Sequence, residues 1–262
     1  MTLKIAIAGV AGRMGQALIA AASDDVVVVG GSERPGAPEI GKDITGSGGG
    51  WTVSDAANKA AMGADVWIDF TTPTASLAAL DLLKLTKVKA AVVGTTGLAP
   101  PQEQQVAEHA KRIAIVRARN FSLGVNLMIG LVEQAAARLG ADWDIEISET
   151  HHGKKVDAPS GTALMMGEAA AKGRGKPLAQ LRVPPHDGIT GARKEGAIGF
   201  SVRRAGGVIG DHEAVFASEE EILSIGHRAI SRAIFAKGAL VAARWAASQP
   251  PGLYSMRDVL SL

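Results

Sequence analysis

One stretch of the chain, HHGKKVDAPSGTA from His151 to Ala163, concentrates groups that exchange protons or bind anions. It contains two histidines, two lysines, an aspartate and a Ser-Gly-Thr triplet. Histidine and lysine both donate protons near neutral pH when their surroundings adjust their pKa. Three interpretations compete: a metal site, an acid–base site for an anionic substrate, or a solvated loop.

The second half of this stretch carries the signals of a helix start. Pro159 precedes Ser160, a residue type that commonly caps helices, and the composition predicts a helix over 160–172. The backbone amides near Gly161 and Thr162, the threonine hydroxyl and the helix dipole then attract an anion. The two lysines add positive charge, so we expect the partner to be an anion, most simply a carboxylate.

The paired histidines argue against a metal site. Adjacent side chains on an extended chain point in opposite directions, so His151 and His152 would not share an ion. The chain has no cysteine, and no second cluster of metal-binding residues stands out in the sequence. We expect no metal, and we expect the isolated His186, His212 and His227 to be structural.

A glycine-rich turn near the N-terminus predicts a dinucleotide-binding unit. The apolar run 3–8 is followed by GVAGRMG, a helical segment and the β-branched run VVVVGG. Gly9, Gly12 and Gly15 match a variant of the dinucleotide fingerprint in which Ala11 stands at the second glycine position. Strand, turn, helix and strand in this order form a βαβ unit whose helix start accepts a pyrophosphate.

Glu33 and Arg34 follow the second predicted strand, where a ribose-binding carboxylate belongs. The Glu33 carboxylate would accept hydrogen bonds from the adenosine ribose hydroxyls. The Arg34 guanidinium beside it would accept a 2′-phosphate. The pair therefore predicts use of both NADH and NADPH, and the alternative for each residue is a solvated loop charge.

Three further segments, 65–70, 89–93 and 113–116, predict strands that alternate with helices. This alternation indicates a parallel, doubly wound sheet, and ligands bind such sheets where the carboxyl ends of the strands emerge. The segments that follow the strands should therefore share one edge: Gly9 to Met14, Glu33, Thr71 and Thr72, Gly94 to Thr96, and Asn120 with Phe121.

The C-terminal half has a different pattern. A predicted helix over 123–139 leads to the alternating strand DIEISET, and a charged, glycine- and proline-rich loop spans 173–196. The segments AIGFSVRRAG, VIGDHEAVFAS and EEILSIGHRA alternate with the period of strands, and a last helix spans about 231–247. The predicted fold class is α/β: a Rossmann-like doubly wound parallel sheet plus a second α+β substrate and oligomerisation domain with a mixed sheet.

The composition excludes several classes of protein. The net charge is +2, from 28 basic and 26 acidic residues, and aromatic residues make up 4% of the chain, which leaves little from which to build a nucleic-acid surface. The longest stretches without charge are shorter than a membrane span. The absence of cysteine suits a reducing compartment. We expect a cytoplasmic protein that binds neither nucleic acid nor membrane.

The motifs together identify a family. GVAGRMG, GSER, DFTTP, GTTG, ARNFSLGVN and above all ETHHGKKVDAPSGTAL resemble the 4-hydroxy-tetrahydrodipicolinate (dihydrodipicolinate) reductases of the diaminopimelate route to lysine, over nearly the whole chain. The resemblance implies an NAD(P)H-dependent reductase of a small cyclic dicarboxylate and a cytoplasmic homotetramer. It also implies a dinucleotide-binding domain over 1–122 plus 232–262, and a substrate-binding and oligomerisation domain over 123–231.

The resemblance also implies roles for individual residues. It makes His151 the acid–base residue and Lys155 the proton donor, and it assigns His152, Gly161 and Thr162 to the substrate carboxylates. Lys154 and Asp157 receive no role, and Arg119 is a large cation where some members carry a small residue. The implied cofactor contacts are Gly9, Val10, Ala11, Gly12, Arg13, Met14, Glu33, Arg34, Gly94, Thr95, Thr96, Ala118, Arg119, Asn120 and Phe121.

Two alternatives remain open at this stage. One is another two-domain NAD(P)-dependent oxidoreductase acting on a small carboxylate, although such enzymes place other residues at the catalytic strand end. The other is a non-catalytic NAD(P) sensor, although a sensor has no need of an acid beside an anion pocket.

Overall fold

The chain folds into two compact units, which are described separately. A computed structural model describes residues 2–46 and 49–262. The first unit runs to Leu123 and resumes over Ala233–Ser261, and the second comprises Gly124–Arg232 with Leu262. No helix within the described residues is long and apolar enough to cross a membrane.

The first unit is built on a six-stranded sheet in the order β12-β7-β6-β5-β1-β2. Every neighbouring pair in it is parallel. The central strands are buried along their length because helices cover both faces, which explains their continuous apolar sequences. The strands are β1 (Leu3–Ala8), β2 (Val26–Ser32), β5 (Val66–Asp69), β6 (Ala90–Val93), β7 (Ala114–Arg117) and β12 (Gly252–Tyr254).

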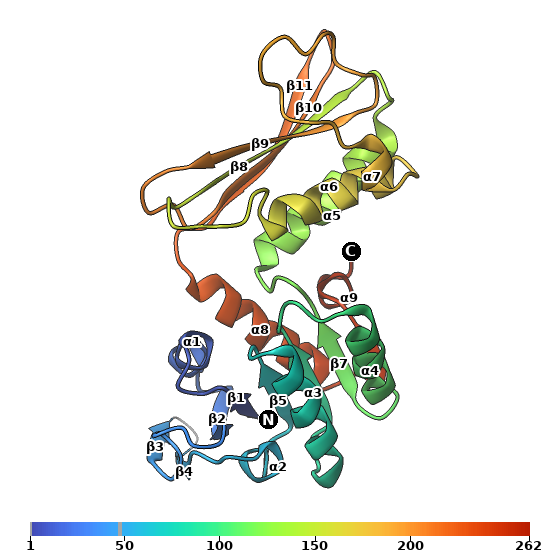
Figure 1. Ribbon diagram of the computed structural model, residues 1–262. Helices are drawn as coiled ribbons and strands as arrows, with labels where there is room; N and C mark the ends of the chain where they lie inside the picture. The colour runs from blue at the N-terminus through green and yellow to red at the C-terminus, as the bar shows by residue number, and fades with distance from the viewer. Residues whose placement is uncertain (1, 47–48) are drawn as a thin grey trace. The chain divides into compact units, whose positions relative to one another are not determined.

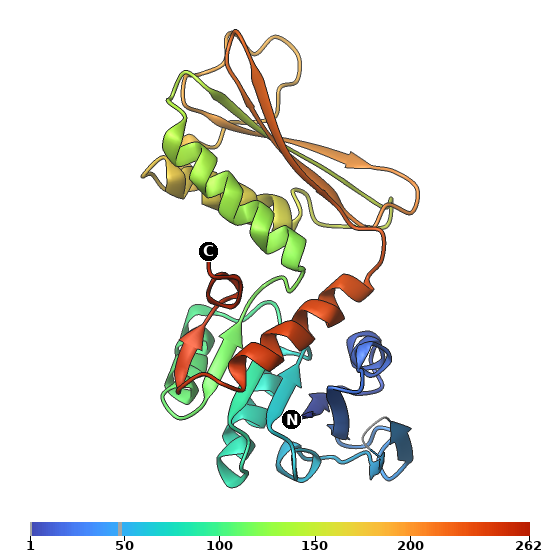
Figure 2. The ribbon, with the colours of Figure 1, turned by 180° about the vertical axis from the view of Figure 1, so that it is seen from behind.

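Two apolar clusters lie on the two faces of this sheet. Side chains of α1 (Arg13–Ala21), α8 (Ala233–Ala246) and α9 (Met256–Leu260) pack on one face. The other face is covered by α2 (Ala57–Ala60), α3 (Pro73–Leu82), the 3₁₀ turn η1 (Leu83–Leu85) and α4 (Pro100–Ala110). Figures 1 and 2 show these two helical layers from opposite sides. A small hairpin of β3 (Asp43–Gly46) and β4 (Gly49–Thr52) follows β2.

The second unit has a four-stranded mixed sheet in the order β11-β10-β8-β9. β8 is parallel to β9 and antiparallel to β10, which is antiparallel to β11. α5 and α6 cover one face, and the other face carries no helix of this unit (Figures 1 and 2). The elements are α5 (Leu123–Arg138), β8 (Asp144–His151), α6 (Gly161–Gly173), α7 (Leu178–Leu181), β9 (Ile198–Arg204), β10 (Asp211–Ala217) and β11 (Ile222–Arg228).

The predicted fold class is confirmed: a parallel doubly wound sheet with helices, and a second unit with a mixed sheet. The sequence patterns do not indicate β12, the hairpin β3–β4 or α9. β12 has only three residues, and β3 and β4 have four each, too few for a period to register. The loop predicted over 173–196 contains the single-turn helix α7.

Candidate active site

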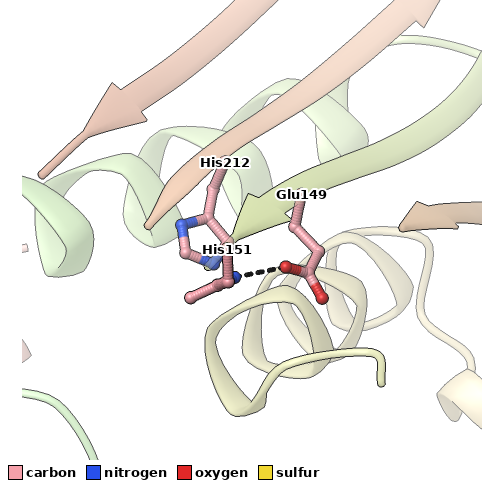
Figure 3. Close-up of side chains that lie close together, drawn as sticks. All are labelled: Glu149, His151 and His212. Carbon is pink, nitrogen blue, oxygen red and sulfur yellow. Dashed lines mark hydrogen bonds and ion pairs between the residues drawn. The ribbon is translucent and has the colours of Figure 1, made fainter. Parts of the chain in front are cut away.

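The predicted acid His151 is the last residue of β8, and its side chain points into the second unit. Residues 149 and 151 share a face of the strand because side chains alternate, so Glu149 lies beside His151. The Nδ1 atom of His151 hydrogen bonds to Oε2 of Glu149 (Figure 3). His151 is 9% exposed and Glu149 only 1%. His152 follows directly after β8 and is partly exposed.

The Glu149 carboxylate is held from several directions. Arg204, at the end of β9, donates from Nη1 to Oε2 and from Nη2 to Oε1, each over 3.1 Å. The Ser160 backbone amide donates to Oε1 over 3.0 Å. Arg204 also donates to the backbone carbonyl of Asp157 over 2.6 Å. One guanidinium therefore ties β8, β9 and the loop before α6 together.

A second histidine completes this cluster. His212, on β10, places its ring edge-on to the His151 ring at a centroid separation of 5.0 Å (Figure 3). Its Nε2 lies 3.1 Å from the Ser160 hydroxyl, which also caps α6 by accepting from the Ala163 amide. Burial, together with the nearby His151, lowers the pKa of His212 to about 4, so this ring is neutral at pH 7.

Burial and charge set the protonation of the pair. Burial lowers the pKa of His151, and the hydrogen bond and charge of Glu149 oppose that effect. Burial also disfavours the charged form of Glu149, but the hydrogen bonds from Arg204, His151 and Ser160 outweigh it and lower the pKa of this carboxyl. The pair is therefore a carboxylate beside an imidazole that can gain and lose a proton.

The other predicted residues of this motif lie in the loop before α6 and in its first turn. Lys155 pairs with Asp157, with 2.7 Å between Nζ and Oδ1, and this contact lowers the pKa of the aspartate. Ser160 caps α6 as predicted, so Gly161 and Thr162 are its first two residues. A Cβ built on Gly161 would meet nothing within 4 Å, so space is open beside the first turn.

Glu149, His151 and His212 also offer three ligand atoms within 4.8 Å of one another, a spacing that a metal ion could use. The Arg204 guanidinium, however, already donates to both oxygens of the carboxylate. A cation at this point would have to displace another cation from a buried carboxylate. The arrangement is better suited to an acid–base pair than to a metal centre.

In the first unit, the glycine turn and Glu33 lie together at the carboxyl edge of the sheet. Gly9 has a φ of +61°, and a Cβ there would lie 2.9 Å from the Thr71 side chain. The Ala11 amide donates to Oε1 of Glu33 over 2.9 Å. A cavity of about 440 Å³ opens here, lined among others by Gly9, Glu33, Arg34, Thr71 and Thr72. The edge predicted from the sequence thus brings these residues together.

A buried polar network supports the neighbouring loops. Asp69 accepts hydrogen bonds from the Thr71 amide and hydroxyl over 2.8 and 2.6 Å, and from the Thr95 hydroxyl over 3.2 Å. The hydroxyl groups of Thr95 and Ser76 lie 2.6 Å apart. The Thr95 side chain, only 1% exposed, is thus committed to internal bonds, and only its backbone is left to contact a ligand.

The remaining predicted cofactor residues follow β6 and β7. A Cβ on Gly94 would lie 2.0 Å from the Phe70 ring, so glycine is required there by packing. Phe70 meets Phe121 edge-on at 5.2 Å between centroids. The Asn120 side chain accepts from the Ser122 amide over 2.8 Å, and Arg119 is exposed.

Sequence reasoning assigned no function to Glu149 or Arg204, and it expected His212 to be structural. The position of Glu149 two residues before His151 is a signal that could have been used, since alternate strand residues share a face. Arg204 and His212 reach the cluster through strand pairing, of His151 with Arg204 and of Glu149 with His212. A single sequence contains no signal for that register.

Comparison with known proteins identifies the family of the chain. The sequence profile for the dihydrodipicolinate reductase N-terminus matches residues 3–121, and the profile for the C-terminus matches residues 124–260. The chain belongs to the dihydrodipicolinate reductase family. The family predicted from the motifs is therefore confirmed.

Individual relatives of this family match along their full length. The 4-hydroxy-tetrahydrodipicolinate reductase of Caulobacter vibrioides is 49% identical over 98% of this chain and 97% of its own. That of Rhizobium rhizogenes is 49% identical over 99% and 97%. The relatives are oxidoreductases, as the sequence predicted for this chain.

Solved structures agree. A dihydrodipicolinate reductase from Paenisporosarcina sp. TG-14, bound to dipicolinate, is similar with a TM-score of 0.76 at 26% identity, covering 97% of this chain and 98% of its own. A DAP dehydrogenase of C. glutamicum has a TM-score of 0.54 at 13% identity, a similarity of fold alone.

Proposed function

We propose that this chain catalyses the NAD(P)H-dependent reduction of 4-hydroxy-tetrahydrodipicolinate to tetrahydrodipicolinate in the diaminopimelate route to lysine. The observation that carries the proposal is the buried His151–Glu149 pair beside the start of α6. This pair lies in a chain that matches the reductase family from residue 3 to residue 260 apart from two residues.

The residues of the pair and its surroundings fit the chemistry of such a reduction. Adding a hydride to an unsaturated substrate leaves electron density on carbon, which an acid must neutralise. In this proposal His151 and Lys155 hold and move that proton. An acid of this kind contributes about 10² to 10⁴ in rate, or roughly 3 to 5 kcal/mol.

The substrate carboxylates are proposed to bind at the first turn of α6. The amides of Gly161 and Thr162 lie at the positive end of a 13-residue helix, with open space beside Gly161. His152, partly exposed just after β8, is the third residue proposed to bind the substrate carboxylates. The cationic Lys155 adds a charge of the sign that a dicarboxylate requires.

The carboxyl edge of the parallel sheet fits a nicotinamide dinucleotide, which supplies the hydride when bound. A Cβ on Gly15 would lie 2.4 Å from the Val10 carbonyl, so the turn and α1 approach as closely as a phosphate-binding turn requires. In this proposal the turn from Gly9 to Met14 holds the pyrophosphate, Glu33 the ribose hydroxyls, and Arg34 the 2′-phosphate of NADPH. The segments Gly94 to Thr96 and Ala118 to Phe121 contact the rest of the cofactor.

We further propose that the units divide the work, with dinucleotide binding in 1–122 plus 232–262, and substrate binding and oligomerisation in 123–231. The proposed assembly is a cytoplasmic homotetramer formed through the face of the four-stranded sheet that carries no helix of its own unit. Ile222, on β11 at that face, is 70% exposed, and Val215 on β10 is partly exposed.

Reductase activity is tested by following loss of NAD(P)H absorbance when the condensation product of pyruvate and aspartate semialdehyde is supplied. We expect consumption, and we expect His151→Gln to lower kcat by about 10² or more with little change in KM. His186→Gln, at an exposed histidine of the 173–196 loop, is the matched control.

The other outcomes are also informative. Cofactor binding without consumption of any small carboxylate would support a sensor, and turnover of a different carboxylate alone would support another oxidoreductase. Full turnover by His151→Gln would remove this residue from the acid role while leaving the reductase activity in place.

A further inference from the structure

We propose that Glu149 is a positioning residue that keeps a proton on Nδ1 of His151 and so makes Nε2 the atom that exchanges a proton with substrate. Arg204 and the Ser160 backbone amide hold the carboxylate in place for this purpose. The inference rests on the acid role proposed above for His151, and it adds residues to which the sequence assigned no function.

The hydrogen bond between the two side chains can run in only one direction. An ionised carboxylate accepts hydrogen bonds and cannot donate them. Glu149 meets three separate donors, namely two Arg204 nitrogens and the Ser160 amide, which favour its ionised form. Nδ1 of His151 must therefore donate to Oε2, which fixes the tautomer of the neutral imidazole.

The other ring nitrogen of His151, Nε2, is not engaged in the same way. Nε2 of His151 has no hydrogen-bond partner among the residues that the structure describes. It lies beside Gly210, where an added Cβ would come within 3.2 Å of it. His212 meets the ring edge-on and, being neutral, contributes no charge. Nε2 is thus left to exchange a proton with a ligand.

The Glu149 carboxylate is itself held in a fixed orientation. The two parallel bonds from Arg204 fix its plane, and the Ser160 amide belongs to the residue that caps α6. The same Arg204 binds the carbonyl of Asp157, whose side chain holds Lys155. Glu149 therefore aligns His151 with both the helix start and the proposed proton donor.

Glu149→Gln tests the proposal because the surroundings determine how the amide must lie. The Ser160 amide needs an oxygen opposite it, so the glutamine carbonyl takes the place of Oε1 and the NH₂ group faces His151. Nδ1 then becomes an acceptor, and the proton of the neutral ring moves to Nε2. We expect kcat to fall at least about 10-fold, with KM changed by less than about twofold.

The pH profile provides a readout that a merely structural role would not move. The charged or titratable groups around His151 are Glu149 on its own strand, Lys155, Arg204 on β9 and His212 on β10. An acid must be protonated to act, so activity falls as pH rises through the pKa of His151. Losing the Glu149 charge moves this fall to lower pH, by about one unit or more.

Arg204→Gln should move the same fall in activity in the opposite direction along the pH scale. It removes a cation that disfavours the imidazolium and leaves the carboxylate beside it. The fall in activity is then expected at higher pH than in the unmodified enzyme. This second variant keeps the proposal testable if Glu149→Gln does not fold. A fall in activity that moves in the same direction along the pH scale in both variants would overturn the proposal.

Nitrogen NMR of the histidine rings in the full-length protein gives a test that needs no turnover. We expect His151 to carry its proton on Nδ1 in the unmodified chain and on Nε2 in Glu149→Gln. Glu108→Gln, the same change at an exposed residue of α4, is the control and should leave tautomer and pH profile unchanged. An unaltered tautomer in Glu149→Gln would overturn the proposal, whereas the expected tautomers in a protein without reductase activity would overturn only the proposed function.

Discussion

At the scale of single residues, partners decide what two similar histidines can do. His151 and His212 lie with their rings 5.0 Å apart and both are buried. His151 has a carboxylate beside it that partly restores the charged form, whereas the hydrogen bond of His212 is with the Ser160 hydroxyl. Burial lowers the pKa of both rings, but the Glu149 carboxylate opposes this effect at His151, whereas the pKa of His212 falls to about 4.

Glu33 and Arg34 are expected to discriminate between the two cofactors. Arg34→Ala should weaken NADPH binding by about 10-fold or more, because a charge-assisted hydrogen bond to the 2′-phosphate is lost. NADH binding should change little, since Glu33 remains beside the Ala11 amide. Fluorescence titration of both cofactors measures the two Kd values, with Lys42→Ala as an exposed control. Equal losses for the two cofactors would contradict the 2′-phosphate assignment.

At the scale of elements, the start of α6 joins structure to chemistry. Ser160 is 2% exposed, its hydroxyl accepts from the Ala163 amide and contacts His212, and its own amide donates to Glu149. The sequence identified the cap because Ser after Pro is a common helix start. The contacts of Ser160 with His212 and Glu149 come from other strands, and no local pattern indicates them.

Ser160→Ala should therefore lower the stability of the protein more than the loss of an ordinary helix cap does. We expect a loss of about 1 to 2 kcal/mol, or a Tm lower by several degrees, because His212 also loses its partner. Ser255→Ala removes the cap of the five-residue α9, which is less buried, and serves as the matched comparison. Scanning calorimetry measures both. Equal changes in Tm would show that the contact with His212 adds nothing to stability.

For the whole molecule, the uncovered face of the four-stranded sheet is the proposed site of assembly. A sheet buries one face on its own helices, and here α5 and α6 provide that cover. Side chains on the other face alternate with core residues: Glu146 and Ser148 lie between the buried Ile145, Ile147 and Glu149. The second face is not covered by helices of its own unit, which supports the proposal that other copies of the chain bind there.

Ile222→Arg tests this assembly. We expect a charge at this exposed position to shift a tetramer to smaller species, because a buried unpaired charge disfavours the interface. Size-exclusion chromatography with light scattering measures the mass. Ile189→Arg, the same change at an exposed residue of the 173–196 loop, should leave the mass unchanged. A tetramer that survives Ile222→Arg would place the interface elsewhere.

The local structure and the family could both be predicted from the sequence. Glycine turns, buried strands and the Ser160 cap depend on neighbours within a few residues, so their patterns indicate the βαβ units and the start of α6. The tertiary structure decided what surrounds His151. Arg204 is 55 residues from Glu149, and His212 is 52 residues from Ser160, and they meet only through the register of β9 and β10 against β8. Register is fixed by burial of one face of the sheet, a property of the folded unit that no local pattern contains.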